Sequence, residues 1–158
     1  MSTPRTVEGE VAAGGPKVAI VAARFNDFIV ASLLKGATSA WLERGGEAED
    51  LLVARVPGAF ELPMAARKLA ASGRYDAVIA LGCVIRGGTP HFEYVAGECA
   101  RGLQQAGLES GVPVIFGVLT VDTVEQAIER AAVGAGNKGG EAMEAALEMA
   151  ALMARLGT

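Results

Sequence analysis

Four runs of the sequence are apolar at nearly every position, and a segment with helical spacing follows each of them. The runs cover residues 17–23, 50–58, 75–85 and 112–120. A continuous apolar run is typical of a strand covered on both faces by helices, whereas a strand with one solvated face alternates apolar and polar residues. Because strands and helices alternate, the sheet is expected to be parallel. The sequence therefore predicts a three-layer α/β sandwich built on a four-stranded parallel sheet.

Five segments have helical spacing, and several of them end at glycine. They cover residues 27–46, 59–73, 89–111, 123–132 and 137–156. Helices on both faces of a four-stranded parallel sheet make the expected arrangement flavodoxin-like. Residues 1–15 are small and polar, so we expect a flexible tail in which only residues 6–11 could form an edge strand. Residues 16–158 have the length of one ordinary domain.

Composition and cysteine use exclude several classes of protein. The net charge is −4 and no run of Lys or Arg occurs, so we expect no nucleic-acid partner. The apolar runs fall short of the ~18 residues of a membrane span, and no signal-peptide pattern opens the chain, so we expect a cytoplasmic protein without a membrane partner. Cys83 and Cys99 form no CxxC pair, which predicts reduced, packed thiols rather than disulfides or a metal site.

The loop after the third strand, "RGGTPH" at residues 86–91, contains the only histidine of the chain. Thr89 suits a helix N-cap and Pro90 suits the first helical position, while the glycines let backbone amides converge at the positive end of a helix. This pattern is typical of a phosphate or carboxylate site, but an ordinary capped turn explains it too. His91 could act as an acid or base on a bound anion, or be a partly exposed side chain.

Two further loops should meet the first one, because ligands of parallel sheets bind at the carboxyl ends of the strands. Phe25 follows the first strand and could stack on a planar ring, although packing against the helix explains it equally well. After the second strand, a Pro-Gly turn at residues 57–58 exposes the backbone of Ala59, Phe60 and Glu61. Glu61 could accept hydrogen bonds from a ligand or merely favour the helix N-terminus.

Two other motifs have weaker chemical readings. Cys83 could form a nucleophilic pair with His91, but it lies inside an apolar strand, where burial makes a thiol unreactive. "GAGNKG" at residues 134–139 matches the dinucleotide-binding pattern, but that pattern has its meaning only between a strand and a helix. Here it follows a helix, so we interpret it as a flexible break between two helices.

The combination of motifs resembles one enzyme family from about Lys17 to Leu156. "ARFN", "VPGAFELP", "ALGCVIRGGTPHFEYV", "FGVLT" and "ER…AGNKG" occur in the order found in the 6,7-dimethyl-8-ribityllumazine synthases of riboflavin biosynthesis. The resemblance implies a transferase that needs neither cofactor nor metal. Its reaction condenses 5-amino-6-(D-ribitylamino)uracil with 3,4-dihydroxy-2-butanone 4-phosphate and releases 6,7-dimethyl-8-ribityllumazine, phosphate and water.

The resemblance also implies a role for each motif residue. Phe25 would stack on the pyrimidine, Ala59, Phe60 and Glu61 would hold the ribityl chain, and Cys83, Val84 and Ile85 would line the uracil edge. Gly88 and Thr89 would bind phosphate, and His91 would be the general acid/base. A neighbouring subunit would contribute Phe116, Arg130 and Lys138, with Arg130 as the phosphate partner. Two positions depart from the common pattern, since Gly88 is often acidic and Ala59 is often serine.

Assembly is expected from both composition and resemblance. Apolar residues make up 51% of the chain, and the last helix carries alanines and methionines over much of its surface, so some helix faces should be buried against other chains. The resemblance implies pentamers. It also favours a sixty-subunit icosahedral shell, because the connection between Arg130 and Lys138 is as short as in the shell-forming members of the family. It also raises riboflavin synthase as a partner to test. The alternatives are a binding protein for flavin or lumazine without turnover, and a mainly structural shell subunit.

Overall fold

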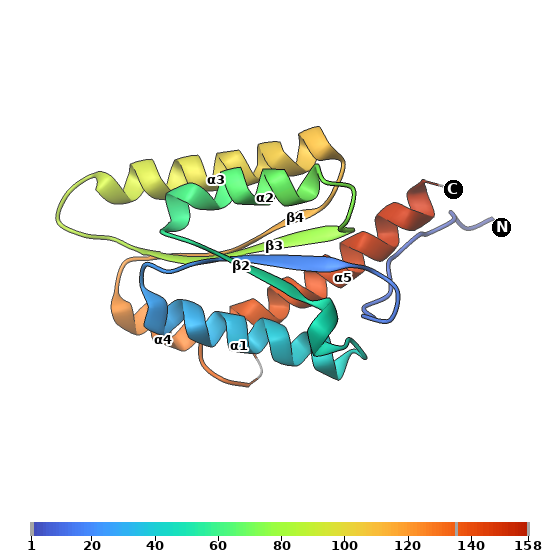
Figure 1. The fold of residues 1–158 in the computed structure, drawn as a ribbon, viewed down its shortest axis with the longest axis horizontal. Coiled ribbons are helices and arrows are strands. Elements are labelled where there is room, and N and C mark those ends of the chain that lie inside the picture. Colours follow the sequence, from blue (N-terminus) through green and yellow to red (C-terminus); the bar gives the residue numbers. More distant parts are fainter. Residues whose placement is uncertain (1, 135, 158) are drawn as a thin grey trace.

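The computed structural model describes residues 2–134 and 136–157 as three layers around one parallel sheet (Figure 1). The sheet has the order β2-β1-β3-β4, and every neighbouring pair is parallel. The strands are β1 (Val18–Ala23), β2 (Leu52–Val56), β3 (Ala77–Ile85) and β4 (Val114–Val121). The helices are α1 (Asp27–Glu43), α2 (Leu62–Ala70), α3 (His91–Ser110), α4 (Val124–Arg130) and α5 (Lys138–Leu156). The predicted flavodoxin-like sandwich is confirmed.

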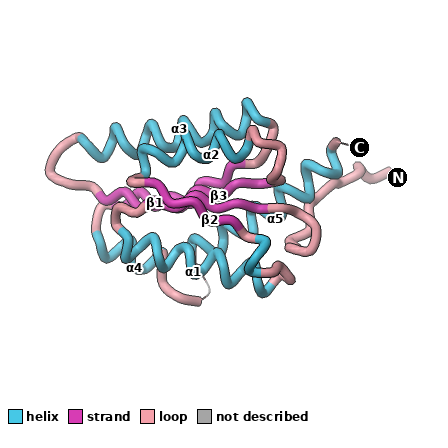
Figure 2. The backbone as a smooth tube through the Cα atoms, in the orientation of Figure 1, coloured by secondary structure: helices cyan, strands magenta, loops and turns pink. Residues whose placement is uncertain are grey.

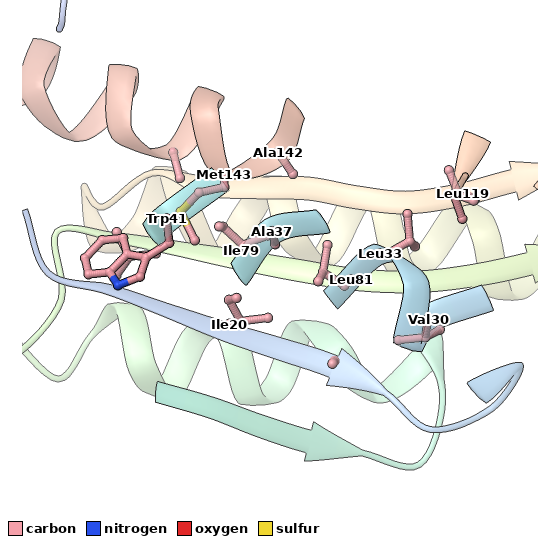
Figure 3. Close-up of a cluster of buried hydrophobic side chains, with 14 of the residues drawn as sticks. Ile20, Val30, Leu33, Ala37, Trp41, Ile79, Leu81, Leu119, Ala142 and Met143 are labelled. Atoms are coloured by element: carbon pink, nitrogen blue, oxygen red, sulfur yellow. The ribbon is translucent and has the colours of Figure 1, made fainter. Parts of the chain in front are cut away.

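The helices divide between the two faces of the sheet. α2 and α3 cover one face, and α1, α4 and α5 cover the other (Figures 1 and 2). Successive residues of a strand point to opposite faces, so Ile20 joins the core beneath α1 and α5 while Val21 joins the core beneath α2 and α3. Trp41, Leu33 and Met143 fill the first core (Figure 3). Both faces of the central strands are therefore buried.

One sequence expectation about the strands is wrong in part. β1 is buried along its whole length and β3 almost so, as their apolar runs predict. β2 is mostly exposed, with Leu52 and Val53 among the exposed apolar side chains. β2 is an edge strand with neighbours on one side only, which a run of apolar residues cannot reveal.

The segment before β1 lies beside the C-terminal part of α5, at the end of the molecule where both termini are found (Figures 1 and 2). Residues 6–11 are in neither helix nor strand, so the edge strand considered for them is not formed. Gly9 lies against α5 so closely that an added Cβ would meet the Glu148 carbonyl oxygen at 1.9 Å. Ala13 is buried, and its N–H donates to the Arg44 carbonyl at 3.1 Å.

Candidate functional site

An open pocket of about 310 Å³ lies at the carboxyl ends of β1 and β3. In this strand order the chain reverses its direction of winding between these two strands, and ligands of open α/β sheets bind at such a switch point. The loop from β3 to α3, at the left end of Figure 1, forms one wall. The lining residues are Phe25, Asn26, Ala59, Cys83, Val84, Ile85, Gly87, Thr89, His91, Phe92 and Val95.

Phe25 and Asn26 follow β1 and differ in their environment. The Phe25 ring is 72% exposed, so it contributes to no core and is free to receive a flat ligand. Asn26 has a left-handed backbone (φ 63°), which asparagine tolerates better than most residues. Its side-chain Nδ2 donates to the Cys83 carbonyl at 2.8 Å. Asn26 thus connects the end of β1 to the end of β3, a contact that the "ARFN" motif does not predict.

The Pro57-Gly58 turn after β2 brings only part of its predicted set to the pocket. Ala59 is buried and lines it. Phe60 and Glu61 are exposed and lie outside its lining, although Glu61 Oε1 would come within 3.3 Å of a Cβ built on Gly58. These two predicted side chains therefore do not line the pocket in a single chain.

The loop after β3 ends in a helix that starts one residue later than predicted. Pro90 is the N-cap of α3 and His91 is its first residue, while the Thr89 hydroxyl accepts from the His91 N–H at a long 3.5 Å. A proline has no N–H to satisfy and a fixed φ, so it fits this boundary. Gly87 and Thr89 line the pocket, whereas Gly88 does not. His91 is exposed at the pocket wall, beside backbone amides at the helix start.

Three of the predicted residues gather elsewhere. Phe116, Arg130 and Lys138 line a second hollow formed by β4, α4 and the start of α5. Arg130 lies in the last turn of α4, where its Nη1 donates to the Gln126 carbonyl at 3.0 Å, and Lys138 Nζ pairs with Glu141 at 3.1 Å. One chain therefore does not bring these side chains to the pocket that contains His91.

A sequence comparison identifies the family of the chain. A sequence model of the 6,7-dimethyl-8-ribityllumazine synthase family matches residues 15–154, which include every strand and four helices entirely. The chain belongs to this family. The matched residues include both the loops around His91 and the hollow around Arg130. All of the motifs therefore lie within the one region that matches the lumazine synthase family.

In this member of the lumazine synthase family, the "GAGNKG" motif serves as a helix start. The Asn137 side chain caps α5, because its Oδ1 accepts from the N–H groups of Gly139 at 2.8 Å and Gly140 at 3.0 Å. Its Nδ2 donates to the carbonyls of Ser32, Ala131 and Ala132. Ala135 lies outside the described residues. The motif follows α4 rather than a strand, which excludes the dinucleotide-binding arrangement.

Residues 2–134 and 136–157 contain neither a metal-ligand cluster nor a membrane-spanning helix. No group of three or more His, Cys, Asp or Glu side chains is placed to hold a metal ion in that part of the chain. The same residues include no helix long and apolar enough to cross a membrane.

The two thiols of this lumazine synthase family member are free and buried, as predicted. Burial raises the pKa of Cys83 and of Cys99 to about 11. A catalytic Cys83–His91 pair is therefore disfavoured, because the thiolate is the nucleophile.

Both cysteines should resist alkylation in the native protein. Since their pKa lies about two units above the ordinary 9.0, iodoacetamide at pH 8 should label them roughly 100-fold more slowly in the native protein than in urea. Because the folded state favours the neutral thiols, their contribution to the free energy of unfolding is fully present below pH 9. It is lost as the pH rises from about 9 to 11. Mass spectrometry of timed samples measures the labelling. Equal rates in buffer and urea would contradict the burial argument.

Proposed function

We propose that the protein catalyses the condensation of 5-amino-6-(D-ribitylamino)uracil with 3,4-dihydroxy-2-butanone 4-phosphate. The products are 6,7-dimethyl-8-ribityllumazine, phosphate and water, in riboflavin biosynthesis in the cytoplasm. The observation that carries the proposal is the pocket at the β1/β3 switch point, where Phe25 and His91 stand on opposite loops. A flat polar ring requires an aromatic platform, and a phosphorylated ketone requires an anion site with a proton shuttle.

The pyrimidine half of the reaction fits the β1 and β3 side of the pocket. The exposed Phe25 ring would stack on the uracil, and main-chain groups of Cys83, Val84 and Ile85 would read its edge. The ribityl chain would extend toward the loop after β2, where the backbone of Ala59 and the exposed Glu61 could bind hydroxyl groups. Because position 59 is alanine rather than the common serine, a contact with the ribityl hydroxyls there would have to come from the main chain.

The ketone phosphate half fits the start of α3. Backbone amides of Gly88 and Thr89 precede the helix, whose N-terminus favours an anion. The amine of the pyrimidine adds to the ketone and loses water to form an imine. A proton and the phosphate are then eliminated, and the enol formed becomes a second carbonyl group. The ribitylamino nitrogen adds to that carbonyl and closes the ring with loss of a second water. His91 would move protons between these groups, because its imidazole lines the pocket and can both accept and donate a proton.

The separate position of Phe116, Arg130 and Lys138 supports a site shared between subunits. Their hollow opens along β4, the other edge of the sheet. A neighbouring copy that docks its β1/β3 pocket there would receive Arg130 as a partner for phosphate and Phe116 as a second wall. No rearrangement within one chain is then required.

The direct test is to mix the purified protein with both substrates and follow the fluorescence of lumazine. We expect turnover with both substrates and none when either is omitted. Binding of lumazine or flavin without turnover would favour a binding protein and reject the proposed reaction.

Replacing Arg130 by alanine should weaken one substrate only. A charge-assisted contact to phosphate contributes about 1.5–3 kcal/mol, so the butanone phosphate should lose roughly 10- to 150-fold in affinity while the pyrimidine keeps its own. Separate titrations by calorimetry measure the two. Arg74→Ala, which removes an exposed charge before β3, is the control. An equal loss for both substrates would reject the phosphate clamp.

Assembly gives a further prediction. An apolar groove with exposed Leu108 and Met153 lies between α3, β4 and α5. Exposed apolar side chains of this size are expected to be buried against other copies of the chain. We expect sixty chains of 16.1 kDa, a closed particle of about 1 MDa by light scattering at neutral pH. A stable species of five chains would reject the shell and keep the shared site, whereas an active monomer would reject both.

A further inference from the structure

Arg86 opens the loop between β3 and α3 and touches three separate parts of the chain. Its backbone N–H donates to the Val121 carbonyl at 2.8 Å. Its side-chain Nε donates to Asp122 Oδ1 at 2.8 Å and its Nη1 to Glu93 Oε1 at 2.9 Å. The guanidinium also lies over the Phe92 ring, 4.4 Å from the centroid. One side chain thus joins the end of β3, the end of β4 and the first turn of α3.

The contact with Glu93 closes a segment that has little else to hold it. Between Arg86 and Glu93 lie two glycines with no heavy atom within 4 Å of where a Cβ would stand, and residues 86–91 are all exposed. The hydrogen bond from the His91 N–H to Thr89 is long. The contacts of the Arg86 guanidinium with Glu93 and Phe92 therefore hold together the two ends of the segment that contains His91 and the amides of Gly88 and Thr89.

The contact with Asp122 extends the connection to the helix that carries Arg130. The Asp122 N–H donates to Gln126 Oε1 at 2.7 Å, and Arg130 Nη1 donates to the Gln126 carbonyl at 3.0 Å. The planar guanidinium can serve two carboxylates and a ring at once, which a lysine ammonium on a flexible stem cannot do in the same geometry. Both hydrogen bonds raise the pKa of Arg86, that to Asp122 more, so the side chain stays charged.

We propose that Arg86 is a positioning residue that fixes the 86–93 loop to the β4–α4 turn and so sets His91 and the anion-binding amides in place. Isolated exposed ion pairs contribute little to stability, so the effect of Arg86 is expected in substrate binding and rate rather than in folding. The inference rests on the proposed function for its substrate, but the geometry of the loop can be tested with inorganic phosphate alone.

The experiment compares Arg86→Gln, Arg86→Lys and Asp122→Ala with the wild-type protein. Phosphate affinity is titrated calorimetrically, and kcat and KM are measured with both substrates. Misplacement of reacting groups by about 1 Å costs up to ~100-fold, so we expect both Arg86 variants to lose about 10- to 100-fold in kcat and in phosphate affinity. The control is Arg67→Gln, which breaks another exposed ion pair, with Glu109, and should change either value less than about twofold.

Two comparisons separate positioning from charge and from folding. Arg86→Lys keeps the positive charge, so recovery of phosphate affinity by lysine would overturn the proposal. Asp122→Ala removes a negative charge, which on electrostatic grounds alone would tighten phosphate binding; positioning requires weaker binding. Thermal midpoints should fall no more in Arg86→Gln than in Arg67→Gln, and a larger fall would assign Arg86 a folding role instead.

The outcomes for Arg86 and for the proposed reaction are distinct. If the wild-type protein makes lumazine and Arg86→Gln behaves like Arg67→Gln, the positioning role is rejected and the reaction stands. If no lumazine forms but phosphate binding weakens in both Arg86 variants, the positioning role stands and the reaction is rejected. A wild-type protein that binds no phosphate rejects the positioning role.

Discussion

Replacing His91 by alanine should lower kcat by ~10²–10⁴-fold, the usual contribution of a positioned acid or base. His91 is the first residue of α3, at the wall of the pocket and next to the loop amides. Part of the activity should remain, because an amine and a ketone condense unaided and the pocket still brings them together. Steady-state rates at saturating substrate, followed by lumazine fluorescence, measure the effect.

The affinity for both substrates should change much less than kcat in His91→Ala, since the imidazole acts mainly after binding. Gln105→Ala, on the same helix and paired with Glu109 far along it, is the matched control. A His91→Ala enzyme as fast as the wild type would remove His91 from the mechanism.

Replacing Asn137 by alanine should lower the free energy of unfolding by at least about 3 kcal/mol, because several buried groups lose their partners together and each such loss costs ~1–3 kcal/mol. Asn137 is 5% exposed. Its side chain accepts from two N–H groups of α5 and donates to three carbonyls from α1 and from the α4–α5 connection. Urea unfolding followed by circular dichroism measures the loss.

Thr123→Ala provides the comparison, since Thr123 also caps a helix but makes a single exposed contact, to the Gln126 N–H at 3.1 Å. We expect it to cost ~1 kcal/mol. Both variants must be compared at one protein concentration, because assembly raises the apparent stability of subunits. Equal losses in the two variants would show that the contacts of Asn137 with α1 add nothing to its cap.

The fold could be predicted from the sequence because the buried strands have a pattern that few other structures share. β1 and β3 are apolar throughout since helices lie on both of their faces. The edge position of β2 could not be predicted, because the side of a sheet on which a strand is added depends on contacts among distant residues.

The candidate site could be predicted only in part. Phe25, Ala59 and His91 follow strands, so the rule that ligands bind at strand ends brought them together. Arg130 and Lys138 are charged residues of helices, which look in sequence like any solvated surface, and only the resemblance singled them out. Asn26 contacts the main chain of Cys83 and Arg86 contacts the side chain of Asp122, both on segments distant in the sequence, and the pattern of a single sequence gives no signal for such contacts.

The pairing of α1 with α5 has a consequence for synthesis of the chain on the ribosome. The two helices meet so closely that a Cβ on Gly139 would lie 1.9 Å from the Leu33 carbonyl oxygen, and Arg44 pairs with Glu144, 100 residues further on. At ~5–20 residues per second, roughly 5–20 s separate the end of α1 from the start of α5. By the time Lys138 is made, α1 to α4 have all been synthesised, but the part of β3 and β4 that α5 covers is still without its helix. A nascent chain that ends before Lys138 thus leaves apolar side chains of β3, β4 and α1 exposed where α5 would pack, and chaperones bind surfaces of this kind.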